Sequence, residues 1–420
     1  MGNVATIPQR VDRETAKRLA GERFSAEIFD KFRDHGDTIS RERLLELDKI
    51  VRPRPSVPLM TQTADPVLVS AIVPVNLPPS PSQSHASCES IVQSLKTHGF
   101  YANSAESGCK SLWSLAALNE ANRVKLGGLG ACETLLQALK AHGQVATVAE
   151  YACGALKTLT INSENQVRIG AAGGCETIVQ ILKSHGQDAG VLAQALEGVK
   201  ALSHRNEPNK NVLISAGACE TILETMKAHV NEERIAQYGC GAMINLAASS
   251  EGRQKFLNGG ACDTLADVLR KHKTSVGICQ YACWVLINLA ADDAARAALG
   301  GSGACEATVE VLREHIAISG VTEYSCWAMV NLSANCAANR TRLCSAGAGE
   351  AALQALQNHP NNQGVATQVS RAVHAIAASA ENKLRLIQSG AVPLLTAIGD
   401  NDSYSFNTRE RAKEAVSRLL

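Results

Sequence analysis

One fourteen-residue segment recurs along most of this chain at nearly constant spacing. GACETLLQALKAHG begins at Gly130, and GGCETIVQILKSHG begins at Gly173. The spacing of 43 or 44 residues is clearest at the acidic position of the segment, which is occupied by Glu89, Glu133, Glu176, Glu220, Asp263, Glu306 and Glu350. A more divergent eighth copy begins at Gly390. A fixed period of this length indicates stacked units that contact only their neighbours and share one continuous core.

The hydrophobic spacing within each unit predicts three helices. Cys132, Leu135 and Leu139 fall at positions i, i+3 and i+7, and so share one helical face. Another apolar helical pattern follows this helix, and a shorter helix, as in ENQVRIGAAG, precedes the glycine that opens the segment. We count eight pairs of second and third helices and seven first helices. His142 and Gly143 end a second helix, and we expect Gly143 to adopt a left-handed conformation there.

The chain divides into three parts by composition. Residues 1–52 are rich in charges of both signs and predict a short helical segment, and residues 53–87 form a Pro/Ser-rich linker. Residues 88–420 are the repeat array. With 41 Lys and Arg against 40 Asp and Glu, the chain lacks the excess charge of a generally basic nucleic-acid-binding protein. It has neither a secretory signal pattern nor an apolar run long enough to cross a membrane.

Cysteine and histidine follow the repeat rather than the spacing of a metal site. Eleven of the fourteen cysteines fall in two columns: Cys88, Cys132, Cys175, Cys219, Cys262 and Cys305, then Cys109, Cys153, Cys240, Cys283 and Cys326. We expect them to be reduced and buried as small apolar residues. The histidines that end the second helices, from His98 to His359, are expected to be partly exposed, and the alternative is a row of pH-sensitive charge. No metal, cofactor, small-molecule substrate or catalytic constellation is predicted.

Residues 88–420 resemble the armadillo repeat family. The resemblance rests on the glycine between first and second helices, the second-helix pattern L-L-x-x-L and third-helix runs such as YACWVLINLA from Tyr281. It implies an all-α fold, a right-handed α-solenoid of about eight repeats of three helices, whose third helices line a concave groove. An array of two-helix HEAT-type units is the alternative, but it would lack the short first helix.

Two third helices match a Trp-x-x-x-Asn pattern that the importin-α branch of this family uses to hold extended peptides. Trp284 with Asn288 and Trp327 with Asn331 match both positions, and Asn245 matches the Asn alone. An Asn amide can donate to and accept from a peptide unit, and Trp offers a flat apolar face. The alternative is structural: Asn would bond to neighbouring backbone and Trp would be core. Other residues fill these positions elsewhere: Ser114, Thr158, Ala201 and Ala375 replace Asn, and Lys110, Gly154, Glu197, Gly241 and Arg371 replace Trp.

The residues one turn before the Trp position are expected to add polar contacts to a bound peptide. In the middle of the array these are Gln237, Gln280 and Glu323. Together with the Asn and Trp residues they predict a non-catalytic scaffold or adaptor that binds an extended segment of a protein partner and no nucleic acid. An importin-α-like cargo carrier is one alternative. The expected location is the cytoplasm, with the nucleus or a membrane surface as alternatives.

The N-terminal segment carries two further resemblances. FDKFRDHGDTISRERLLEL from Phe29 resembles a degenerate EF-hand of the calcineurin B type, with Arg33 and Arg43 where calcium ligands would open and close the loop. A calcium site is therefore not expected. Gly2 with Thr6 matches the N-myristoylation pattern. Acylation of Gly2 would make the protein a membrane-tethered armadillo adaptor, which is the second alternative function.

Overall fold

The computed structural model describes residues 10–12, 38–40 and 87–420, in two parts that are treated separately. The first part is a pair of short antiparallel strands, β1 (Arg10–Asp12) and β2 (Thr38–Ser40), with Val11 opposite Ile39. These six residues were predicted to belong to a helical segment. Their β-branched residues favour extended backbone instead. The resemblance to an EF-hand is not supported, and the rest of that segment, the linker up to residue 86 and Gly2 lie outside the described residues.

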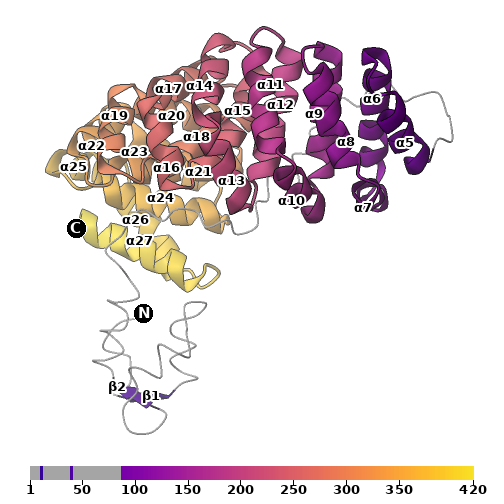
Figure 1. Ribbon diagram of the computed structural model, residues 1–420. Helices are drawn as coiled ribbons and strands as arrows, with labels where there is room; N and C mark the ends of the chain where they lie inside the picture. Colours follow the sequence, from indigo (N-terminus) through magenta and orange to yellow (C-terminus); the bar gives the residue numbers. More distant parts are fainter. Residues whose placement is uncertain (1–9, 13–37, 41–86) are drawn as a thin grey trace. The chain divides into compact units, whose positions relative to one another are not determined.

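The second part is all helical, and its helices follow one another in the predicted order (Figure 1). The second helices are α5 (Cys88–His98), α8 (Ala131–His142), α11 (Gly174–Ser184), α14 (Ala218–Ala228), α17 (Ala261–Lys271), α20 (Ala304–Glu314), α23 (Ala348–Asn358) and α26 (Ala391–Asp400). The third helices are α6 (Ala102–Leu118), α9 (Ala146–Leu159), α12 (Ala189–Ser203), α15 (Glu233–Leu246), α18 (Val276–Leu289), α21 (Ser319–Ser333), α24 (Gln363–Ile376) and α27 (Phe406–Leu419). The first helices are α7 (Glu120–Gly128), α10 (Ser163–Ala171), α13 (Glu207–Ser215), α16 (Ser250–Asn258), α19 (Asp293–Gly301), α22 (Ala337–Ser345) and α25 (Ala380–Gln388).

These bounds confirm the eight pairs of second and third helices and the seven first helices. Because seven repeats contain the short first helix, the two-helix alternative does not apply. The chain over residues 88–420 is an all-α solenoid.

A glycine with left-handed backbone joins each first helix to the second helix that follows. Gly130 has φ +83° and Gly303 has φ +90°, and the equivalent glycines of the other repeats share this conformation. A side chain there would be strained, which explains why the position is glycine in all seven repeats that contain a first helix. The expectation for Gly143 was wrong: its φ is −61°, because the second helix ends in a right-handed turn that leads directly into the third helix.

The core runs continuously through the stack and contains almost all of the cysteines. All fourteen are free thiols, and all except Cys336 are buried. Burial raises the pKa of the Cys153 and Cys283 thiols to about 12, so both stay protonated at neutral pH. The prediction that the cysteines act as small apolar residues is thus confirmed.

A ladder of histidine hydrogen bonds joins the repeats at the ends of the second helices. In each case Nε2 lies close to a backbone carbonyl oxygen of the preceding repeat: His142 to Gly99 (2.9 Å), His185 to Gly143 (2.5 Å), His229 to Gly186 (2.7 Å), His272 to Val230 (2.8 Å), His315 to Lys273 (2.7 Å) and His359 to Ile316 (2.8 Å). Because a carbonyl oxygen only accepts, each Nε2 carries the proton. In the last repeat the Tyr404 hydroxyl replaces histidine and donates to the carbonyl of Pro360. The histidines therefore connect adjacent repeats.

Replacing His272 by alanine should lower the free energy of unfolding by about 1–2 kcal/mol, because the carbonyl of Val230 loses its partner. Urea unfolding followed by circular dichroism measures the effect. His98 provides a matched control, since it is exposed, it also ends a second helix and no described repeat precedes it. Equal losses for His272→Ala and His98→Ala would contradict a role for the bond between repeats.

Candidate functional site

The third helices form the inner row of the stack and carry every residue predicted to bind a peptide. Neighbouring third helices pack against each other along the whole array, far more extensively than neighbouring second helices do. That difference is expected for the inner row of a curved stack. Arginines of the first helices stabilise the ends of the third helices: Arg296 Nη1 donates to the Ala290 carbonyl at 2.7 Å, and Arg340 Nη1 to that of Ser333 at 2.9 Å.

The three predicted asparagines lie between adjacent third helices rather than on an open face. Asn245, Asn288 and Asn331 are 5%, 3% and 1% exposed. Their Nδ2 atoms donate to backbone carbonyls of the preceding third helix: Lys200 at 2.9 Å, Ile244 at 3.0 Å and Ile287 at 3.0 Å. These contacts match the structural alternative, because each amide donor is already used within the solenoid.

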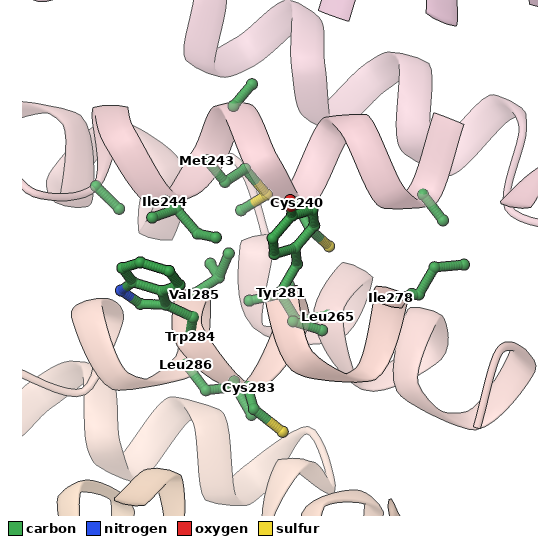
Figure 2. Packing of buried hydrophobic residues seen from close by; sticks show 14 of the residues in the cluster. Cys240, Met243, Ile244, Leu265, Ile278, Tyr281, Cys283, Trp284, Val285 and Leu286 are labelled. Carbon is green, nitrogen blue, oxygen red and sulfur yellow. The ribbon is translucent and has the colours of Figure 1, made fainter. Parts of the chain in front are cut away.

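The two predicted tryptophans differ in burial. Trp284 is 4% exposed and stacks on Tyr324 of the next third helix, with 5.4 Å between ring centroids and 18° between planes. Figure 2 shows Trp284, Tyr281 and Val285 of α18 among the buried side chains of α15 and α18. Trp327 is only half-buried and packs at the edge of the core. Tyr324 therefore covers Trp284, whereas Trp327 is only partly covered, by the Arg371 guanidinium 5.9 Å from the centre of its ring.

The three predicted polar residues contact the start of the next third helix. A Cβ atom added to Gly277 would lie 3.1 Å from Gln237 Nε2, and one added to Gly320 would lie 3.1 Å from Gln280 Nε2. A Cβ atom added to Gly364 would lie 2.2 Å from Glu323 Oε2. The glycines leave space for these side chains, all of which are half-buried. Burial raises the pKa of Glu323, for which the described residues offer no ion-pair partner.

Lysines that the sequence analysis did not single out lie on the N-terminal half of the same row. Lys157 Nζ lies 2.9 Å from Glu197 and 5.7 Å from the centre of the Trp113 ring. Lys200 Nζ donates to the Tyr281 hydroxyl at 2.9 Å. Lys157 and Lys200 share one register position, just before the Asn column, so the repeat alignment could have identified them. The third-helix surface thus carries charges of both signs in its N-terminal half, and amides, aromatic rings and the Glu323 carboxylate at its centre.

Other classes of site have little support in the described part of the chain. It contains no group of three His, Cys, Asp or Glu side chains placed to hold a metal ion. No helix among the described residues has the length and apolar character needed to cross a membrane.

Comparison with known proteins supports the fold. No family model matches the chain, and no curated protein matches it. An engineered protein from the Northeast Structural Genomics Consortium superposes with a TM-score of 0.69 at 19% identity, covering 79% of this chain and 78% of that chain. A designed armadillo repeat protein in complex with the peptide (KR)4 gives a TM-score of 0.51 at 22% identity, over 58% of this chain and 99% of that chain. Computationally designed armadillo repeat proteins for modular peptide recognition give 0.52 at 23% identity, over 58% and 99%.

Identities this low establish the fold alone. The described repeats and these neighbours agree on the same architecture. Residues 88–420 form an armadillo-like helical repeat solenoid.

Proposed function

We propose that this protein is a non-catalytic scaffold or adaptor whose third-helix row binds an extended segment of a protein partner. The observation that carries the proposal is the half-buried polar and aromatic surface at the centre of the row. Gln237, Gln280, Glu323 and Trp327 all lie on it. Amides and one flat ring suit a peptide backbone and its side chains, whereas nothing there suits a reaction.

The proposed contact residues fall into two groups. Trp327, Gln237, Gln280 and Glu323 would contact a peptide directly because they are half-buried. Asn245, Asn288, Asn331 and Trp284 are also proposed contacts, but they are buried among the helices. The Asn288 Oδ1 atom accepts no hydrogen bond from the described residues but is itself buried, so its contact with a peptide N–H group would require the surrounding side chains to move.

The designed neighbours support this reading of the surface. One is in complex with the peptide (KR)4, and others were designed for modular peptide recognition. Neighbouring helices lie about 8–10 Å apart, so an extended peptide of 12 residues, about 40 Å long, would span four or five third helices. An importin-α-like carrier would prefer (KR)4 over uncharged peptides. A membrane-tethered adaptor would depend on Gly2, and a Gly2→Ala variant that fractionates like the wild type would contradict it.

Selection from a phage-displayed library of random 12-residue peptides tests the proposal. We expect the full-length protein to enrich related sequences, and Trp327→Ala to weaken binding of a selected peptide by about tenfold or more, since buried aromatic contacts dominate such interfaces. Fluorescence anisotropy measures the affinities. Arg342→Gln, which changes an exposed first-helix residue, is the control and should bind as the wild type does. A library that yields no enriched peptide would contradict the proposed function.

A further inference from the structure

A cation without a counter-ion lies beside the central surface, on α24. The guanidinium of Arg371 lies 5.9 Å from the centre of the Trp327 ring, and its Nη1 donates to Gln368 Oε1 at 3.0 Å. No described carboxylate lies within ion-pair distance of it. Burial lowers the pKa of Arg371, which reflects the loss of water around the charged group. A desolvated cation with only a neutral partner gains more from an incoming anion than a solvated cation does.

The neighbouring residues make this end of the row positive. A shallow, open depression between α24 and α27 is lined by His374, Glu410, Lys413, Glu414, Ser417 and Arg418. Arg371 is not part of this lining but lies about one turn before His374 on α24. Its two carboxylates already have partners: Glu414 lies 2.7 Å from Arg411, and Glu410 lies 3.5 Å from Lys413. Arg418 has no ion-pair partner among the described residues. Arg371 and Arg418 therefore make no ion pair with a described carboxylate, although the charge of Glu414 acts on Arg371 and opposes the lowering of its pKa by burial.

The histidine of this depression adds a neutral donor. Burial lowers the pKa of His374, and the positive charge of Arg418 lowers it further. A neutral imidazole can donate one hydrogen bond without adding charge. His374 lies about one helical turn after Arg371 on α24, so the two residues lie on the same face of this helix.

We propose that Arg371, His374 and Arg418 form an anion subsite that binds an acidic side chain of the partner peptide. This inference rests on the proposed function, because the peptide would reach the subsite from the Trp327 surface. The planar guanidinium of Arg371 can donate two parallel hydrogen bonds to a carboxylate. The subsite sets both specificity and direction: an acidic residue at one position of the peptide lies against α24, and the rest of the peptide runs across Trp327 towards α15.

The peptide library described above also tests the subsite. Peptides selected on the full-length protein should share an Asp or Glu at one fixed position. Replacing that residue by its amide should weaken binding to the wild type about tenfold, which corresponds to about 1.4 kcal/mol, but should change binding to Arg371→Gln less than twofold. Arg371→Glu should instead select Lys or Arg at the same position. Because Arg371 packs on Trp327, Arg418→Gln is a second variant with less effect on folding, and it should also weaken binding of the acidic peptide. Arg342→Gln is again the control.

The outcomes separate this inference from the proposed function. Enriched peptides that share no acidic residue would overturn the subsite and leave the proposed scaffold function intact. The same conclusion would follow if replacing the acidic residue weakened binding equally to the wild type and to Arg371→Gln. A library without enriched peptides would overturn both. Melting curves of each variant confirm that the protein tested is folded.

Discussion

Replacing Trp284 by alanine should lower the free energy of unfolding by about 3–5 kcal/mol. The indole is almost completely buried and stacks on Tyr324, so its removal leaves a cavity between α18 and its neighbours. Urea unfolding, followed both by circular dichroism and by the fluorescence of the remaining tryptophans, measures the change. Long repeat arrays can unfold in more than one step. The unfolding transition of the central repeats should therefore be compared between Trp284→Ala and the wild type.

Trp327→Ala is the matched control for Trp284→Ala. The two tryptophans occupy the same register position in neighbouring third helices, but Trp327 is only half-buried. Removal of the Trp327 ring should lower the free energy of unfolding by about 1–2 kcal/mol. This loss is smaller than the loss for Trp284→Ala because less buried apolar surface is removed. Affinity for a selected peptide should instead fall more for Trp327→Ala than for Trp284→Ala. Equal stability losses for the two variants would contradict the burial described here.

Simultaneous replacement of Asn245, Asn288 and Asn331 by alanine should lower the free energy of unfolding by about 3–6 kcal/mol. Each substitution removes a buried hydrogen bond and leaves a carbonyl of the preceding third helix without its partner, at a cost of about 1–2 kcal/mol. The three bonds share no atoms, so we expect the losses to add approximately. Thermal and urea unfolding of the triple variant measure the sum.

A triple variant at exposed asparagines provides the control for that experiment. Asn103, Asn231 and Asn361 are exposed, so their replacement by alanine should change stability by less than about 1 kcal/mol in total. If Asn245, Asn288 and Asn331 could be replaced at no cost in stability while affinity for a selected peptide fell, their main role would be peptide contact. A loss of stability with unchanged peptide affinity would assign them to the solenoid alone.

Local patterns account for the parts of this fold that could be predicted. Helices end where short-range rules require, as at the left-handed Gly130 and Gly303, and the cysteine columns mark faces that are buried in every repeat. The role of Gly143 could not be predicted in this way, because a glycine at a helix end can adopt either hand. The strands β1 and β2 were missed because their pairing joins residues 10–12 to residues 38–40, far apart in the chain.

The sequence by itself determined the repeat period, the three helices of each unit and the registers at which Trp, Asn and Gln recur, because all of these follow from spacing within about 44 residues. The tertiary structure decided which of those side chains face a ligand. Adjacent third helices lie close enough to bury Asn245, Asn288, Asn331 and Trp284, but they leave Trp327 only half-buried. It also places Arg371 of the next repeat on that ring. Such contacts join residues of different repeats. Which side chains they bury therefore depends on how tightly the third helices stack, and spacing within one repeat cannot predict it.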